Sequence, residues 1–206
     1  CAFWCNPCYL IVMPIVINGS GSITGISAGG LPDGIIQAAD LATGVGGKIL
    51  QYVYDSKTDV VSNNLASQTW WSLYNAGLQV TLTPTSASNK IYLIAFFNIF
   101  DTTGQWLQFR FEQDGSQIDE TVGDAASSRP RATGQHMNGG DNNGGRFYMM
   151  AAEVNADSTS SRSYNLGFRH TSGQTRTLYL NRTGDDTDAY SYARTISTIT
   201  AMEVAA

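Results

Sequence analysis

The sequence predicts an all-β fold, in which a jelly-roll-like antiparallel β-sandwich head follows a glycine-rich N-terminal stalk with a short helix. From Lys48 onward, short runs of β-branched and aromatic residues recur between turn signals, at the spacing of a sandwich or barrel. Apolar Leu78, Val80 and Leu82 alternate with polar neighbours, as expected for a strand with one buried face. Helical periodicity is nearly absent after residue 48. We therefore assign residues 48–206 to one β-sandwich head domain.

The stalk, or attachment segment, is predicted over residues 13–47. Four glycines between residues 25 and 34 add backbone entropy that folding must remove. A Leu-Pro-Asp-Gly turn over residues 31–34 precedes two possible helical turns over residues 35–42. Such a segment is best ordered by neighbouring chains, although an ordinary flexible linker is the alternative. The apolar side chains that we expect at contacts between copies are Ile26, Leu31, Ile35, Ile36 and Leu41.

Residues 1–12 are interpreted as a leader that does not belong to the native protein. Met13 begins a plausible native start, and the segment before it holds Cys1, Cys5 and Cys8. A structural zinc site needs four ligands, and His136 is the nearest histidine, so we expect no metal there. A lipid-anchored Cys1 is the alternative, with no preceding signal to support it.

The head is expected to contain ten strands. Asp114-Gly115 tolerates positive φ and predicts a tight hairpin. Trp70 and Trp71 must point to opposite faces of a strand, so one fills the core and the other meets a neighbour or solvent. Residues 92–97 are apolar on both faces, which places them at the domain centre or at a subunit contact. The strands are expected over residues 49–54, 69–73, 78–83, 90–100, 106–113, 116–121, 147–154, 163–170, 177–181 and 195–204.

The stalk turn, with Gly-Leu-Pro-Asp-Gly before Ala-Ala-Asp-Leu-Ala, resembles the junctions of tail-fibre and appendage proteins of tailed bacteriophages, particularly phages of marine bacteria and cyanobacteria. Lys-Ile-Leu-Gln at residues 48–51, the unit at residues 78–91 and the ending at residues 198–204 are similar to the head domains of such fibres. The likeness covers residues 13–206. It implies a virion protein assembled in the host cytoplasm and exposed on the particle surface.

Charge and loop length suggest how such a head would bind. The net charge of −5 argues against nucleic acid, because phosphate binding requires a positive field. A loop over residues 123–145 is long enough to be functional or mobile. Outside this loop, the aromatic rings of Tyr190 and Tyr192 could stack on sugar rings. Mobile decoration or a subunit contact is the alternative for this loop. The receptor-contact candidates are Arg129, Arg131, His136, Asn138, Asp141, Asn142, Tyr190 and Tyr192.

Catalytic and metal motifs are weak. Ser27 lies in a Gly-x-Ser-x-Gly sequence, but an all-β context lacks the strand and helix of a nucleophile elbow. Carboxylates around the predicted hairpin, such as Glu112 and Asp119, could serve a glycosidase, although a solvated hairpin explains them better. Residues Asp185–Asp188 offer oxygen ligands for calcium without the spacing of an EF-hand. We therefore predict no catalytic residue, cofactor or metal.

The leading hypothesis is a non-enzymatic tail-fibre or appendage subunit that forms a homotrimer and binds the host surface. Its partners would be its own copies, other virion proteins through the N-terminal segment, and a host glycan or protein, without membrane insertion. The alternatives are a capsid decoration or cement protein and, less favoured, a secreted carbohydrate-binding module.

Overall fold

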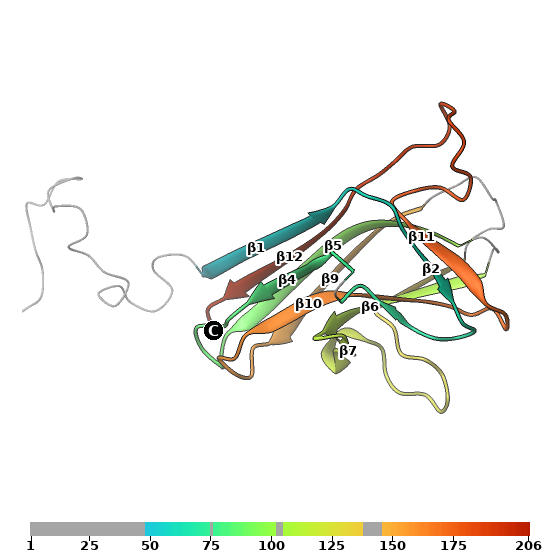
Figure 1. Ribbon diagram of the computed structural model, residues 1–206. Coiled ribbons are helices and arrows are strands. Elements are labelled where there is room, and N and C mark those ends of the chain that lie inside the picture. The colour runs from blue at the N-terminus through green and yellow to red at the C-terminus, as the bar shows by residue number, and fades with distance from the viewer. Residues whose placement is uncertain (1–47, 75, 102–104, 138–145) are drawn as a thin grey trace, which may run out of the picture. The chain divides into compact units, whose positions relative to one another are not determined.

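The protein is an antiparallel β-sandwich of two six-stranded sheets, as the computed structural model shows (Figure 1). The structure describes residues 48–74, 76–101, 105–137 and 146–206. By its internal contacts the chain divides at residues 46 and 47, and the second unit is the head. The predicted fold class is thereby confirmed for the head, while the stalk, its short helix and the five apolar contact candidates lie outside the described residues. No helix in the described ranges is long and apolar enough to cross a membrane.

Sheet A is organised around one long strand, β5. Its N-terminal part pairs with β12, which pairs in turn with β1, and its C-terminal part pairs with β11, which pairs with β2. Along its other edge β5 pairs with β9 over almost its whole length. The strands of sheet A are β1 (Ile49–Lys57), β2 (Val61–Leu65), β5 (Lys90–Asp101), β9 (Arg146–Asn155), β11 (Arg176–Leu180) and β12 (Ser197–Val204).

Sheet B is organised around β6 and β10, which pair with each other. The short strands β3 and β4 both pair with β10, and β7 and β8 both pair with β6. A short 3₁₀ helix, Asp119–Thr121, follows β7. The strands of sheet B are β3 (Trp71–Ser72), β4 (Gln79–Leu82), β6 (Trp106–Gln113), β7 (Ser116–Gln117), β8 (Gly134–Met137) and β10 (Arg162–His170).

The core lies between the two sheets and follows the alternation seen in the sequence. Leu93, Ala95 and Phe97 of β5 are fully buried, and Phe97 packs against Phe109 and Phe168 of sheet B at ring distances of 5.4 and 5.1 Å. Every second residue of β5 therefore meets sheet B. The intervening side chains of β5 point to the outer face of sheet A.

The two ends of the sandwich differ. At the end that we call proximal, β1 begins, β12 ends and β5 begins, since Ile49 is paired with Val204 and Val204 with Lys90. At the opposite, distal end β5 ends and β6 begins, and β10 ends and β11 begins. Figure 1 shows the C-terminus at the proximal end. The chain thus enters and leaves the head at the same end.

A buried carboxylate, Glu203, fixes the proximal end. It accepts hydrogen bonds from the Thr85 backbone N–H (2.6 Å) and hydroxyl (2.8 Å), the Asn89 amide (2.6 Å) and the Gln51 amide (2.6 Å). Burial opposes ionisation, but these donors outweigh it and hold the pKa of Glu203 below its ordinary value. One side chain therefore links β12, β1 and the connection that carries the chain from sheet B to sheet A.

Most predicted strands are present, with four local corrections. The strand expected over residues 69–73 is paired only at Trp71 and Ser72, and the one over residues 116–121 ends early, where the 3₁₀ helix begins. Strands β2 and β8 were not expected, and β8 lies inside the loop predicted over residues 123–145. β8 forms because the edge of β6 offers it a backbone partner.

The hairpin and tryptophan predictions are confirmed. Asp114 and Gly115 have φ values of 51° and 78°, as a tight two-residue turn between β6 and β7 requires. Trp71 is buried in the core, whereas Trp70 lies with its ring 4.0 Å from the guanidinium carbon of Arg110 on the outer side of sheet B.

Candidate functional site

The connection from β11 to β12, residues 181–196, is the candidate site, and Asn181 closes its stem. Asn181 has a φ of 64°, a left-handed conformation that asparagine tolerates better than most residues. Its N–H donates to the Asn98 carbonyl (3.0 Å), and its own carbonyl accepts from the Thr195 N–H (3.1 Å). The two ends of the loop are therefore joined to each other and to β5.

The side chain of Asn181 adds a second set of bonds at the same place. Its amide donates to the carbonyls of Lys57 (2.7 Å) and Asp59 (3.0 Å), and its oxygen accepts from the Ser197 hydroxyl (2.6 Å). Asn181 is fully buried. Because an unsatisfied buried amide is costly, these bonds favour one orientation of the stem.

Ion pairs brace the loop above its stem. Asp186 lies 3.2 Å from the Arg182 guanidinium and 2.7 Å from that of Arg194, on the two sides of the loop. Arg182 also stacks on the ring of Tyr179 at 4.1 Å, and Tyr179 stacks on Phe100 of β5. The loop therefore rests on the distal part of sheet A.

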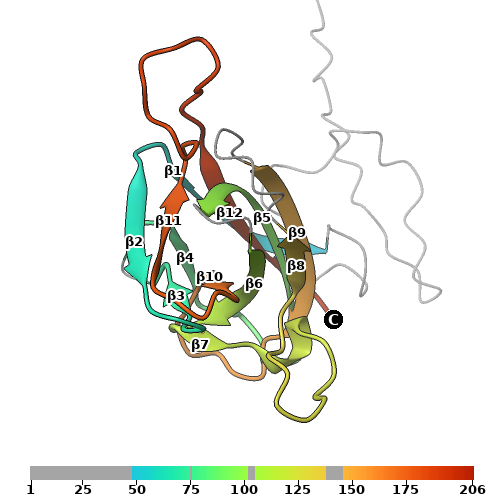
Figure 2. The same ribbon diagram turned by 90° about the vertical axis from the view of Figure 1, so that its right-hand side faces the viewer.

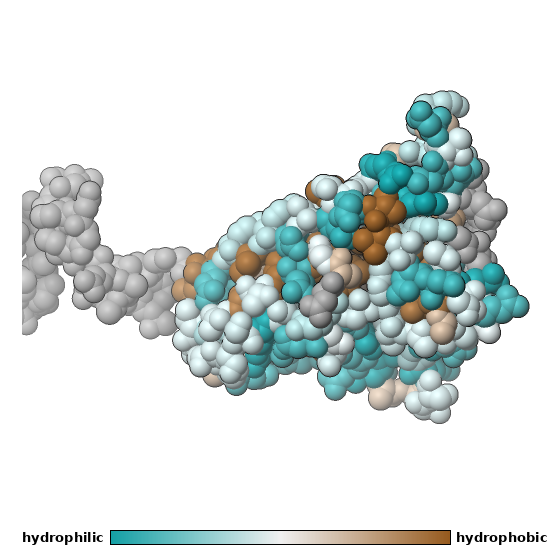
Figure 3. Space-filling view, in the orientation of Figure 1, coloured by the Kyte–Doolittle hydropathy of each residue, from teal (hydrophilic) through white to brown (hydrophobic). Residues whose placement is uncertain are grey.

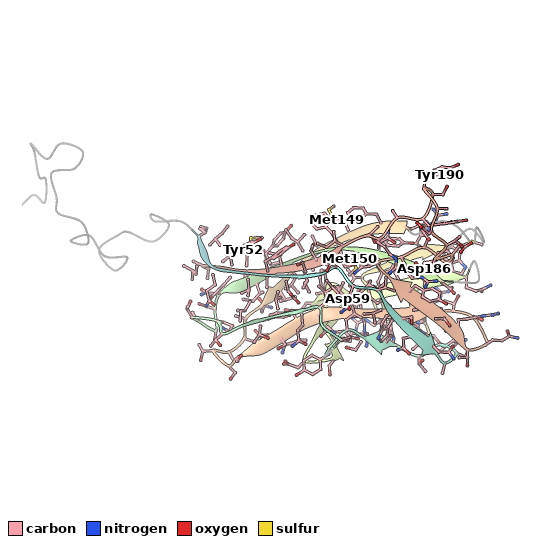
Figure 4. The ribbon with its side chains drawn as sticks, turned by 45° about the horizontal axis from the view of Figure 1, so that its top comes forward. Tyr52, Asp59, Met149, Met150, Asp186 and Tyr190 are labelled. Atoms are coloured by element: carbon pink, nitrogen blue, oxygen red, sulfur yellow. The ribbon has the colours of Figure 1, made fainter. Side chains whose placement is uncertain are left out.

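The tip of the loop combines an exposed aromatic ring with a small polar cleft. Tyr190 is fully exposed, and Figure 4 shows it at the far end of the loop. The cleft has a volume of about 220 Å³, below the roughly 300 Å³ typical of sites for drug-sized ligands, so it suits one sugar ring or one side chain. Its lining residues are Asp186, Thr187, Asp188, Ala189, Tyr192 and Arg194.

The acidic run beside the cleft makes internal contacts. Asp185 accepts from the hydroxyl and the N–H of Thr187, and this contact holds the pKa of Asp185 below its ordinary value. Asp186 is held by the two arginines. Within the described parts of the chain, no three histidine, cysteine, aspartate or glutamate side chains are grouped as metal ligands would be.

Tyr190 and Tyr192 are the sequence candidates that lie at this loop. Arg129 and Arg131 belong to the connection from β7 to β8, which Figure 2 shows on the opposite side of the sandwich. Arg131 donates to Asp119 (2.9 Å), and His136 of β8 packs edge-on against Tyr148 with the ring centres 5.6 Å apart. The structure does not bring these residues together with the two tyrosines. The candidates Asn138, Asp141 and Asn142 lie outside the described residues.

Comparisons with known proteins leave the function open. No protein-family model and no curated protein sequence matches this chain. Among solved structures, the chain is similar to the EclA C-terminal domain, a sugar-binding protein, with a TM-score of 0.31 and 11% identity over 69% of this chain and 78% of that one. It is also similar to the VP2 subviral particle of infectious bursal disease virus, with a TM-score of 0.24 and 12% identity over 73% of this chain and 37% of that one. Likenesses this weak carry no argument about function.

The carboxylates that sequence analysis considered for glycoside hydrolysis have structural partners. Glu112 is fully buried and accepts from the Arg110 Nε (3.0 Å) and Nη2 (2.8 Å) and from the Asn165 amide (3.0 Å). Gly167 leaves the room for it, since a Cβ there would lie 2.4 Å from Glu112 Oε1. Asp119 and Glu120 line a separate cleft of about 460 Å³ near the proximal end.

Sequence analysis proposed the two tyrosines of the loop as receptor contacts, but it did not predict the residues that hold the loop. Arg182, Asp186 and Arg194 carry no motif, and their pairing depends on the path of the loop. A signal was nevertheless present: an aspartate with an arginine four residues before it and another eight residues after it, inside a polar connection between two strands.

Proposed function

We propose that this chain is a virion structural protein, a tail-fibre or appendage subunit, in which three copies assemble and bind the host cell surface. The sequence resemblance to phage fibre proteins supports this proposal. The proposed role requires binding and assembly but no catalysis. The N-terminal segment would attach the head to other virion proteins.

The observation that carries the proposal is the braced loop at residues 181–196. It leaves sheet A where β12 begins, and the eight residues of β12 separate it from the proximal end by roughly 25 Å at the rise of a β-strand. The N-terminal segment enters at that proximal end. A head attached there would therefore hold Tyr190 and the polar cleft away from its attachment.

The cleft favours a glycan as the ligand. The oxygens of Asp186, Asp188 and Thr187 offer acceptors for sugar hydroxyls, the Arg194 guanidinium offers donors, and Tyr190 offers an exposed ring face. A cleft of this size gives weak binding for one copy. Three copies held at a fixed spacing would multiply that binding through avidity.

The test is binding of the full chain to an array of bacterial surface polysaccharides and to a panel of marine bacterial and cyanobacterial cells. Tyr190→Ala and Tyr192→Ala should each weaken binding by about two- to tenfold, the range of one lost stacking contact of about 0.5–1.5 kcal/mol. Tyr74→Ala is the matched control, because Tyr74 is also exposed but lies against the β6–β7 turn on the other sheet. Binding that survives both loop substitutions, or that Tyr74→Ala weakens equally, would contradict a receptor site at this loop.

A further inference from the structure

The outer face of sheet A carries a continuous array of exposed apolar side chains that runs from near the proximal end toward the distal end. Six of them define what we call the aromatic face: Tyr52, Tyr54, Tyr92, Phe96, Phe147 and Met149. They come from β1, β5 and β9. Figure 4 shows Tyr52 and Met149 projecting from the same side of the ribbon, and Figure 3 shows hydrophobic residues over β1.

The strand register makes these side chains neighbours. One row across the sheet runs from Tyr52 through Met202 to Tyr92, since each is paired with the next. A later row runs from Thr198 through Phe96 to Met149. The ring of Phe147 then stacks on that of Phe96, with the ring centres 5.8 Å apart. The array is therefore one surface and not a set of isolated residues.

The exposed area of this face approaches what a stable association requires. The exposed fractions are 63% for Tyr52, 50% for Tyr54, 37% for Tyr92 and Phe96, and 64% for Phe147 and Met149. Because an aromatic side chain carries roughly 150–250 Å² of surface, the six together expose on the order of 600 Å². Ile94 and Met202 beside them are only partly buried and add to this. A specific interface buries about 800 Å² on each partner, and the largest apolar patch on a typical monomer is roughly 300–600 Å², so this face is at or above the upper end of that range.

The arrangement of large and small side chains on the aromatic face is complementary to the same face of a second copy. Small side chains, Thr198 and Thr200 of β12 and Ala151 of β9, lie between the bulky ones of β1, β5 and β9. Ridges of aromatic side chains therefore alternate with shallow troughs, and ridges from one copy can occupy the troughs of another. Aromatic residues and methionine are also the types enriched in the cores of protein interfaces.

The charges around the face do not oppose such a contact. Lys90 and Glu153 lie at its proximal border, 3.8 Å apart, and offset each other. Beyond that pair, the rows formed by residues 52, 54 and 56 of β1 and their partners on β12, β5 and β9 contain no aspartate, glutamate, histidine, lysine or arginine. Apart from this pair, two copies therefore bring together uncharged surfaces, and Glu153 keeps Lys90 as its partner.

We propose that the aromatic face binds further copies of this chain. The inference names the face that the proposed assembly uses, and it rests on the proposed function only for the number of copies. In an assembly with the strands of all copies parallel, the proximal ends lie together. The β1 strands of all copies then begin side by side at that common end.

The first test is the mass of the full chain, by light scattering after size-exclusion chromatography, at up to roughly 100 µM, well above a micromolar Kd. We expect a multimer for the wild type. Tyr52→Lys and Met149→Lys each place a charge in the contact and should weaken association by at least about a hundredfold, giving monomers. Tyr74→Lys, on an exposed residue of the other sheet, should leave the mass unchanged. Circular dichroism confirms that each variant is folded.

A second measurement needs no substitution. Met149 and Met137 are both exposed in the single chain, at 64% and 51%, but Met137 lies on β8 of sheet B. In the wild-type multimer, peroxide should oxidise Met149 at least about fivefold more slowly than Met137, because oxidation follows access to the sulfur. A wild-type monomer, a multimer that both lysine variants preserve, or equal oxidation of the two methionines in the multimer would each overturn the inference. A wild-type multimer that does not bind cells would instead contradict only the proposed function.

Discussion

Replacing Glu203 with glutamine should destabilise the head at neutral pH. The carboxylate accepts four hydrogen bonds from Thr85, Asn89 and Gln51. A glutamine at position 203 keeps one acceptor oxygen. Its amide NH₂ replaces the other oxygen and then faces a donor, such as the Gln51 amide, that has lost its acceptor. A hydrogen bond to a charged group contributes about 1.5–3 kcal/mol, so losing one such bond and weakening the others should cost about 3 kcal/mol. For a domain of this size that lowers Tm by roughly 6–12 °C.

The pH dependence of this effect gives a sharper test than its size. The pKa of Glu203 is lower in the folded chain than its ordinary value, so the stabilisation is complete above the unfolded pKa and is lost as the pH falls through the folded one. Urea unfolding of Glu203→Gln and wild type at neutral and acid pH should therefore show a stability gap that narrows in acid. Glu153→Gln, on a carboxylate 58% exposed, is the matched control and should change stability by less than about 0.5 kcal/mol. A gap below that value at neutral pH, or one independent of pH, would refute the reasoning.

Three further predictions concern other buried groups. Asn181→Ala removes three side-chain hydrogen bonds at a left-handed residue and should lower the free energy of unfolding in urea by about 2–4 kcal/mol. Proteolysis within residues 182–195 should become faster, and an unchanged cleavage rate would contradict the role of Asn181 in the stem. Gly167→Ala places a Cβ 2.4 Å from Glu112 and should cost about 3 kcal/mol, whereas Gly173→Ala meets no atom within 4 Å and should be nearly neutral; equal costs would count against this explanation. Burial raises the pKa of Tyr148 to about 12, so the stability that the neutral phenol contributes is complete below the ordinary tyrosine pKa of about 10 and is lost as the pH rises through about 12. In ultraviolet difference titration, Tyr148→Phe should show one late-ionising phenol fewer than the wild type, and an equal number would contradict this.

Local patterns predicted the elements whose own residues specify them. The strand at Trp106–Gln113 has the bounds expected from its alternation, and the Asp114-Gly115 turn needs only its own two residues. The strand Val61–Leu65 was missed because three of its five residues, Ser62, Asn63 and Asn64, have low strand propensity. It is extended because β11 offers a partner along all five residues. The sequence alone did not show which strands distant from each other in the chain pair in the sheet.

The surfaces could be predicted only in part. Apolar side chains on both faces of residues 92–97 indicated either a central position or a subunit contact, and the structure shows which ones point outward: Tyr92 and Phe96, with Ile94 between them. Tyr52 and Phe147 were not expected beside them. Tyr52 and Phe147 lie on strands far apart in the sequence. Only the pairing register of sheet A places their side chains on the same face as Tyr92 and Phe96 of β5.

The hydrogen bond from Thr195 to the Asn181 carbonyl makes the loop between them a self-contained module. The residues that fix its stem, Asn98, Lys57, Asp59 and Ser197, all lie outside residues 182–195. A foreign segment grafted between Arg182 and Arg194 would therefore leave the register of β11 and β12 unchanged, and closing a longer loop costs little additional entropy. The head can thus serve as a scaffold whose β11–β12 loop is exchanged, in the laboratory or during evolution, without redesign of the sandwich.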